Sequence, residues 1–178
     1  MESRPAPELP LETDRLLLRL WRVSDAALQR ELWAERDPRV PARRRIDADG
    51  HPTIHDLEER IRAGLQPRLL AVELKASGEV IGYCGVIDSD YAAEGVEPGE
   101  PELAFEFLRR AWNQGYATEA AQSVISWARA SGYRQLWAGV RDWNLASRRV
   151  LAKLGFVETD RVDQDALHGD SLLTTRLL

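Results

Sequence analysis

Residues 102–133 constrain the fold most, because a strand pattern there runs directly into a long helical pattern. In residues 102–107, ELAFEF, apolar and other residues alternate, which is typical of a strand with one buried face. The next pattern repeats at three and four residues and predicts a helix over 117–131. Its apolar face is mostly small and suits close packing on a sheet: Ala117, Ala120, Ala121, Val124, Ile125 and Ala128.

Strand and helix patterns alternate along the rest of the chain, which predicts the α/β class with a mixed sheet. The expected strands cover residues 15–21, 69–74, 80–88, 102–108, 135–140, 156–162 and 171–177. A turn at residues 76–78 makes the second and third of these a hairpin. The other expected helices run over 24–36 with Ser24 as the cap, from a cap at Thr53 with Asp56 at the capping-box position, and over 145–154.

Composition limits the organisation and the partners of the chain. Its 178 residues suit one domain over 1–178, with residues 1–12 as a flexible leader. No apolar run reaches signal-peptide or membrane-span length, which predicts a cytoplasmic protein without a membrane partner. Cys84 is the single cysteine, and the three histidines lack metal-ligand spacing, so neither a disulfide nor a metal is expected. A net charge of −5 argues against nucleic-acid binding, despite the local basic run Arg43-Arg44-Arg45.

The turn that opens the helix, residues 114–118, has the features of an anion site. The first turn of a helix leaves backbone N–H groups unpaired and carries a partial positive charge. Gly115, Ala117 and Thr118 would let a phosphate approach that backbone. The alternative is that Gly115 only serves a tight strand-to-helix turn and Ala117 only packs, and these residues alone leave both interpretations open.

Two motifs resemble those of a known family. The run ELAFEFLRRAWNQGYATEA, residues 102–120, is similar to the acetyl-coenzyme A motif of the GNAT superfamily, in particular its ribosomal-protein alanine N-acetyltransferase branch (RimJ/RimL-like). Residues 144–156 are similar to the same branch's N-x-x-S-x-x-x-L-x-K-L-G-F, and LETDRLLLR resembles its first strand. The chain departs from the branch at Ala104 and Asn113, where Gly is usual, and at Gln114, where Lys or Arg is usual.

The resemblance implies a GNAT-type central sheet of seven strands, mixed but mostly antiparallel, flanked by about four helices. Strands 102–108 and 135–140 would splay apart in a V, and acetyl-CoA would lie in the gap. Pantetheine would pair with the backbone of Phe105, Glu106 and Phe107. The pyrophosphate would accept hydrogen bonds from the backbone of the helix-opening turn: Gln114, Gly115, Tyr116, Ala117 and Thr118.

Acyl transfer to an amine requires the amine to lose a proton. Glu102 is the first candidate for the base and Glu106 the second, because both lie on the same face of the strand that enters the anion site. Partial burial beside Phe105 and Phe107 would raise the pKa of such a carboxylate toward a useful range. The strand pattern does not decide which of the two residues is the base. It also leaves open that a water chain takes the proton, or that both residues are ordinary solvated glutamates.

The second motif supplies the remaining candidates. Many relatives protonate the leaving thiolate with a Tyr four residues before the final Gly-Phe pair, where this chain has Leu151. Ser147 is therefore the candidate donor, Asn144 would fix the cofactor or the helix start, and Lys153 would pair with a cofactor phosphate. The alternative is that Asn144 is an N-cap with Ser147 at its third helical position, and that Lys153 only complements the helix dipole.

These features predict an acetyl-CoA-dependent N-acetyltransferase that works by direct attack in a ternary complex, as a monomer or homodimer. Cys84 is expected in the core rather than in catalysis. A protein N-terminal α-amine is the favoured acceptor, and a small amine such as an antibiotic or polyamine is the alternative. An acidic pocket lined by residues 88–101 would favour cationic small molecules, and an open groove a peptide. A non-catalytic acyl-CoA-binding module is the second alternative.

Overall fold

The computed structural model describes residues 8–65, 68–88, 96 and 99–178 of the chain. Within these residues, eight strands form one sheet in the order β1-β2-β3-β4-β5-β6-β8-β7. All neighbouring strands are antiparallel except β5 and β6. The strands are β1 (Leu11–Glu12), β2 (Leu16–Arg19), β3 (Leu69–Leu74), β4 (Val80–Ile87), β5 (Glu102–Phe107), β6 (Gln135–Arg141), β7 (Val157–Asp163) and β8 (Ser171–Leu177).

The sheet confirms the expected architecture with one strand more than the seven expected. The additional strand is β1, whose two residues pair with Leu17 and Leu18 of β2 although they fall inside the predicted leader. Residues 1–7 of that leader lie outside the described residues. The assignment of the whole chain to one domain stays a prediction. The hairpin of β3 and β4 is confirmed, and its turn contains Gly78 with a positive φ of 73°.

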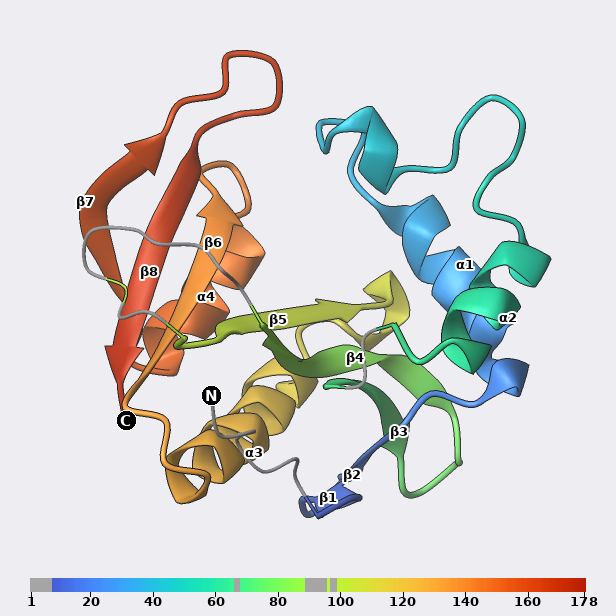
Figure 1. Cartoon of the computed structure of the whole chain (residues 1–178), viewed down its shortest axis with the longest axis horizontal. Helices are drawn as coiled ribbons and strands as arrows, with labels where there is room; N and C mark the ends of the chain where they lie inside the picture. Colours follow the sequence, from blue (N-terminus) through green and yellow to red (C-terminus); the bar gives the residue numbers. More distant parts are fainter. Residues whose placement is uncertain (1–7, 66–67, 89–95, 97–98) are drawn as a thin grey trace.

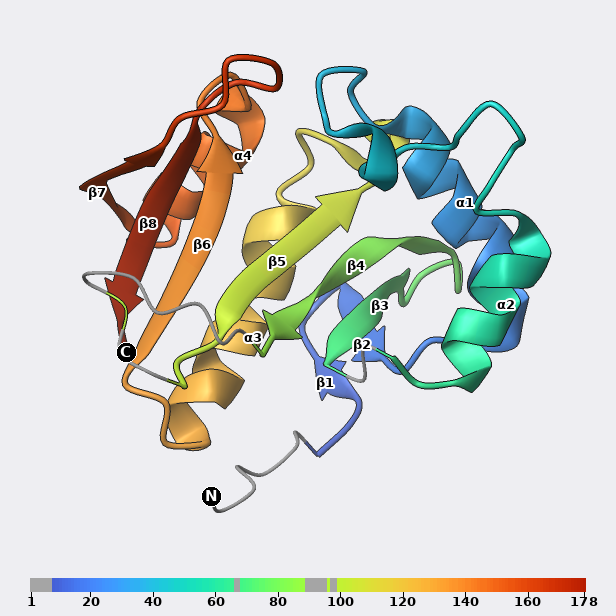
Figure 2. The ribbon, with the colours of Figure 1, turned by 45° about the horizontal axis from the view of Figure 1, so that its top comes forward.

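Four α-helices flank the sheet in the described part of the chain: α1 (Ala26–Glu35), α2 (Ile54–Arg62), α3 (Tyr116–Ala130) and α4 (Leu145–Lys153). Helix α3 lies behind the middle of the sheet and α4 behind β6 (Figures 1 and 2). Helices α1 and α2 pack on each other at the other end of the sheet, where α1 contacts β4. Strands β5 and β6 thus lie between α4 at one end of the sheet and the pair α1 and α2 at the other (Figure 1).

The helix starts agree with the sequence patterns in one case and differ in another. Thr53 caps α2: its side chain accepts from the backbone N–H of Asp56, and the Asp56 carboxylate accepts from that of Thr53 in return. The prediction that Ser24 caps the next helix upstream was wrong. Residues 23–25 form a short 3-10 turn, and α1 begins only at Ala26, because the Asp25 carboxylate bonds back to the Arg22 N–H and to Arg19 instead.

The core lies between α3 and the sheet. The predicted small face of α3 is buried there through Ala120, Ala121, Val124, Ile125 and Ala128, with Ala117 partly buried beside it. Their small size brings the helix close to β2, β4 and β5, and each large aliphatic side chain buried against it contributes about 1.5–3 kcal/mol. Cys84 is fully buried in this core, as expected, and burial raises the pKa of its thiol.

Candidate active site

Strands β5 and β6 separate almost as soon as they meet. They are parallel and in register only at Glu102 and Trp137, where the Trp137 N–H donates to the Pro101 carbonyl at 3.3 Å. Beyond this point the two strands point in different directions, β6 toward α4 and β5 toward α1 (Figures 1 and 2). The splay expected from the resemblance is therefore present, and within the described residues it leaves one edge of β5 without a strand partner beyond Glu102.

The three β5 residues expected to pair with pantetheine differ in where their backbone groups point. Because the β4–β5 register is unbroken and the Leu108 N–H donates to the Ile81 carbonyl, alternation directs the backbone of Glu106 toward β4. The backbone groups of Phe105 and Phe107 face the opening. The Phe107 carbonyl already accepts from the Trp112 indole at 2.7 Å, so Phe105 offers the freer donor and acceptor.

No capping side chain covers the first turn of α3. Gly115 occupies the N-cap position with a φ of 83°. Gln114 and Gly115 are exposed, and residues 116–118 are half-buried. The N–H groups of this turn have no partner inside the helix, because the intrahelical bonds start with Glu119 N–H to the Gly115 carbonyl at 3.0 Å.

A cation lies beside this turn, although position 114, where Lys or Arg is usual in the branch, is Gln in this chain. Arg15, just before β2, donates to the Gln114 carbonyl at 3.1 Å and forms an ion pair with Glu119 at 2.6 Å. Its guanidinium lies over the Tyr116 ring, 4.5 Å from the centroid. Sequence reasoning missed this residue because no local pattern links positions 99 to 104 residues apart.

Glu102 lies at the narrow end of the splay. Its Oε1 accepts a weak hydrogen bond from the Gly139 N–H of β6 at 3.4 Å. Burial raises the pKa of its carboxyl, and the Gly139 N–H and the positive charge of Arg44 only partly oppose that effect. No ion pair involves Glu102 in the part of the chain that the structure describes. Its environment is that of a carboxylate made more basic, which suits proton transfer.

Glu106 is held differently although it lies on the same face of β5. Arg36 grips its carboxylate with two hydrogen bonds, Nε to Oε1 at 2.8 Å and Nη2 to Oε2 at 2.7 Å. Arg36 also lies over the Trp33 ring at 4.2 Å and donates to the Arg44 carbonyl. Burial is the main cause that raises the pKa of the Tyr83 hydroxyl, and the negative charge of Glu106 raises it further. The structure thus distinguishes two glutamates that the strand pattern left equivalent.

The α4 residues take the places that capping predicts. The Asn144 side chain accepts from the Ser147 N–H at 3.2 Å, so Asn144 is the N-cap. Ser147 is half-buried, and its hydroxyl has no hydrogen-bond partner within the described ranges. Leu151, where many relatives have Tyr, is 3% exposed in the core. Lys153 is exposed in the last turn of α4, and capping and dipole effects account for its place and that of Asn144.

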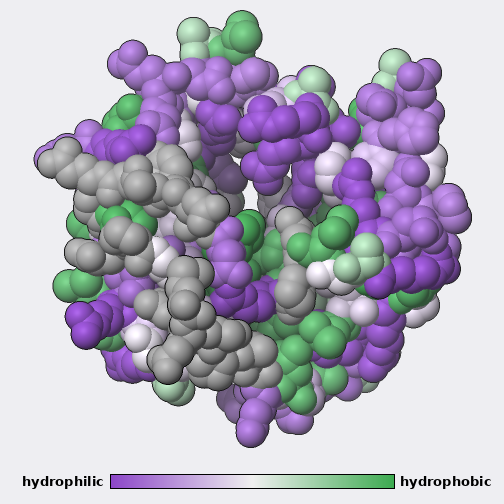
Figure 3. All heavy atoms as spheres, viewed as in Figure 1, coloured by the Kyte–Doolittle hydropathy of each residue, from purple (hydrophilic) through white to green (hydrophobic). Residues whose placement is uncertain are grey.

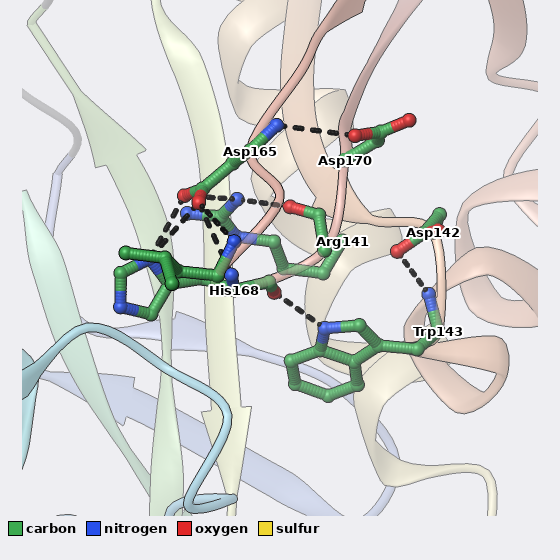
Figure 4. A network of polar contacts seen from close by, with 8 residues as sticks. Arg141, Asp142, Trp143, Asp165, His168 and Asp170 are labelled. Carbon is green, nitrogen blue, oxygen red and sulfur yellow. Dashed lines mark hydrogen bonds and ion pairs between the residues drawn. The ribbon is translucent and has the colours of Figure 1, made fainter.

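A polar cluster fixes the turn between β6 and α4 (Figure 4). The Trp143 indole donates to the His168 carbonyl at 2.7 Å, and Asp165 pairs with both Arg141 and His168. On the other side of the opening, Arg39 lies over the Trp143 ring at 4.1 Å. The segment between α1 and α2 therefore contacts the β6–α4 turn across the mouth of the splay. The sequence pattern did not reveal this contact.

The described residues form neither a metal-binding cluster nor a membrane-spanning helix. Among the residues that the structure describes, no group of three or more His, Cys, Asp and Glu side chains is placed to hold a metal ion. No helix in the same residues is long and apolar enough to cross a membrane.

With this geometry established, comparison with known proteins identifies the family. Residues 15–157 match the acetyltransferase (GNAT) domain, and the chain belongs to that family of acyltransferases. The uncharacterized N-acetyltransferase p20 of Bacillus licheniformis is 28% identical over 152 residues, which cover 82% of this chain and 81% of that protein.

Solved structures show the same fold. A GNAT acetyltransferase from Bacillus anthracis superposes with a TM-score of 0.75 at 20% identity, covering 95% of this chain and 98% of the other. The ribosomal L7/L12 α-N-protein acetyltransferase RimL, solved with coenzyme A, has a TM-score of 0.71 at 13% identity, covering 96% and 98%.

Proposed function

We propose that this protein transfers an acetyl group from acetyl-CoA to a primary amine, with a protein N-terminal α-amine as the favoured acceptor. The observation that carries the proposal is the position of Glu102, a half-buried carboxylate with a raised pKa at the point where β5 and β6 separate. RimL, which shares the fold, is an α-N-protein acetyltransferase solved in complex with coenzyme A, and this supports both the cosubstrate and the acceptor class. The resemblance of the motifs to the RimJ/RimL branch supports them as well.

The residues of the opening fit the cosubstrate. The free backbone edge at Phe105 would hold the pantetheine arm, and the uncapped first turn of α3 at residues 115–118 would hold the pyrophosphate. Arg15 would supply the positive charge that Gln114 lacks, provided that it keeps its contact with the Gln114 carbonyl. Acetyl-CoA brings an activated thioester, and the chain's own groups move the protons.

In this mechanism, Glu102 accepts a proton from the acceptor ammonium group, directly or through one water, so that a neutral amine attacks. Glu106 is a positioning residue, because its two hydrogen bonds with Arg36 orient the segment that follows α1. These bonds also leave the Glu106 carboxylate poorly placed to take a proton. Ser147 Oγ, which has no hydrogen-bond partner within the described part of the chain, is the proposed proton donor to the departing thiolate.

The test is thiol release from acetyl-CoA with a panel of peptides and small amines. Wild-type protein should release thiol, Glu102→Gln should lose about a hundredfold or more in kcat, and Ser147→Ala should lose less. Glu59→Gln, an exposed α2 glutamate paired with Arg62, is the matched control and should not change the rate. Tight acetyl-CoA binding without thiol release from any amine would support the non-catalytic module instead.

A further inference from the structure

Among the described residues, most carboxylates around the mouth of the splay are held in ion pairs; residues 89–95 and 97–98 of the loop expected to line an acidic pocket lie outside the described residues. Three carboxylates near the mouth are engaged by neighbouring cations: Glu106 by Arg36, Asp37 by Arg39 at 2.8 Å, and Asp165 by Arg141 and His168. Each of these anions is therefore partly neutralised before any acceptor enters. A space-filling view shows a central hollow whose upper rim is formed by hydrophilic residues (Figure 3).

Within the described residues, Arg44 lacks the carboxylate partner that Arg36, Arg39 and Arg141 have at this mouth. It ends the 3-10 turn Ala42–Arg44 and is exposed, and no carboxylate lies within ion-pair distance of its guanidinium in the described ranges of the chain. Burial raises the pKa of both Glu102 and Tyr83, and the positive charge of Arg44 is close enough to oppose part of that rise. The Arg44 guanidinium thus has no carboxylate partner among the described residues and lies within electrostatic range of the proposed base.

The segment that carries Arg44 is held in place. Arg36 Nη1 donates to the Arg44 carbonyl at 2.9 Å while the same side chain grips Glu106 of β5. Upstream in the segment, Arg39 lies over Trp143 on the far side of the opening. Next to Arg44, the Nε of Arg45 is buried without a hydrogen-bond partner within the described residues, so the segment has a further donor that lacks an acceptor.

From this arrangement we infer that the acceptor carries a carboxylate near its amine, and that Arg44 binds this carboxylate while Glu102 faces the amine. Because the proposed acceptor is a peptide N-terminus, this carboxylate would belong to acidic side chains directly after the first residue. A guanidinium binds a carboxylate in a bidentate, charge-assisted way, which gives both affinity and orientation. A polyamine would meet Arg44 as a like charge and be disfavoured. The inference rests on the function proposed above and deepens it.

The test compares three pentapeptides with a free N-terminal Ala that differ only at positions two and three, which are both Glu, both Gln or both Lys. Thiol release with wild-type protein should give a kcat/KM about tenfold higher for the Glu peptide than for the Gln peptide. The Lys peptide and a polyamine should be the poorest acceptors. In Arg44→Gln the Glu and Gln peptides should become nearly equal, whereas Arg44→Lys should keep part of the preference. Arg129→Gln, which removes the same charge from an exposed site in the last turn of α3, should leave the preference unchanged.

The outcomes separate this inference from the proposed function. Thiol release in which the Gln or Lys peptide equals or exceeds the Glu peptide, or a Glu preference that survives Arg44→Gln, overturns the inference and leaves the acetyltransferase intact. No thiol release with any amine overturns the proposed function. Equilibrium binding of the three peptides to protein loaded with coenzyme A decides the charge preference in that case too, because equal affinities would contradict the role given to Arg44.

Discussion

The carboxylate of Glu102 on β5 accepts a hydrogen bond from the backbone N–H of Gly139 on β6, at 3.4 Å, just beyond the only residue pair that joins these two strands in the described structure. The side chain thus occupies the space that a backbone hydrogen bond would fill if the strands stayed together. Its partial burial follows from this place, and burial disfavours the charged form of a carboxyl. The same divergence of the strands that opens a cleft also makes its acidic residue more basic.

We expect the pH dependence of activity to report Glu102. Because burial raises its pKa above the ordinary value of 4.5, kcat/KM should rise with pH through that raised pKa and level off above it. Glu102→Gln should remove this acidic limb along with most of the rate. The measurement is a pH profile with one peptide acceptor, and an unchanged acidic limb in the variant would assign the proton acceptor to another group.

Glu102→Gln should lose activity without losing stability. A carboxyl whose folded pKa is raised contributes stability at low pH that is lost as pH rises through the folded pKa. At neutral pH the ionised Glu102 is therefore unfavourable, and Glu102→Gln should keep or slightly raise the melting temperature. Thermal unfolding at two pH values separates lost catalysis from lost folding. A clear drop in the melting temperature of Glu102→Gln at neutral pH would contradict the expectation that the ionised Glu102 is unfavourable for folding.

Separating Arg36 from Glu106 should destabilise the protein. The two side chains are 11% and 21% exposed, so Arg36→Gln leaves a largely desolvated carboxylate without its cation and should cost about 2–4 kcal/mol. Glu106→Gln in the same chain should restore part of the loss, since the unpaired charge is then removed. A double-mutant cycle in urea measures the coupling, and additive single effects would show that the pair contributes no interaction of its own.

Gly115 should matter for binding as well as for backbone conformation. Its φ of 83° strains any residue with a Cβ, so Gly115→Ala should cost about 1–2 kcal/mol in stability. The methyl group would also stand where the phosphate is expected, and it would meet an Arg15 guanidinium nitrogen at 3.4 Å. Calorimetry should show weaker binding of coenzyme A.

Gly132 provides the matched control at the other end of α3. It has the same φ of 83° with nothing within 4 Å of an added Cβ. Gly132→Ala should therefore cost similar stability and leave coenzyme A binding unchanged. Equal losses of affinity in the two variants would remove the first turn of α3 from the binding site.

The cap of α2 should make stability depend on pH at both ends of the scale. Hydrogen bonds to Thr53 and His51 lower the pKa of Asp56, and the contact with Asp56 raises the pKa of His51. The Asp56 contribution is present above its unfolded pKa and is lost as pH falls through the folded value. The His51 contribution is present below its unfolded pKa and is lost as pH rises through the folded value. Thr53→Ala should cost about 1 kcal/mol, measured by urea unfolding.

Local patterns in the sequence were enough for much of this protein. Alternation in residues 102–107 and the three- and four-residue spacing after Gly115 determine β5 and α3, because both reflect the burial of one face of a single element. Motif resemblance determined the family for a similar reason, since the helix-opening turn has to leave its own backbone accessible. Capping by Thr53 and Asn144 also follows from neighbours in the chain.

Only the tertiary structure decided which glutamate is free. Glu102 and Glu106 are equivalent in the strand pattern, and what separates them is a partner 70 residues away, Arg36, which α1 brings to β5. The same holds for Arg15 beside the α3 turn and for Arg44 at the mouth of the splay. Their positions depend on how helices and strands pack, and a charge's effect depends on the distance and burial that packing sets. Sequence periodicity records neither quantity, so the electrostatics of the site emerge only when the chain is folded.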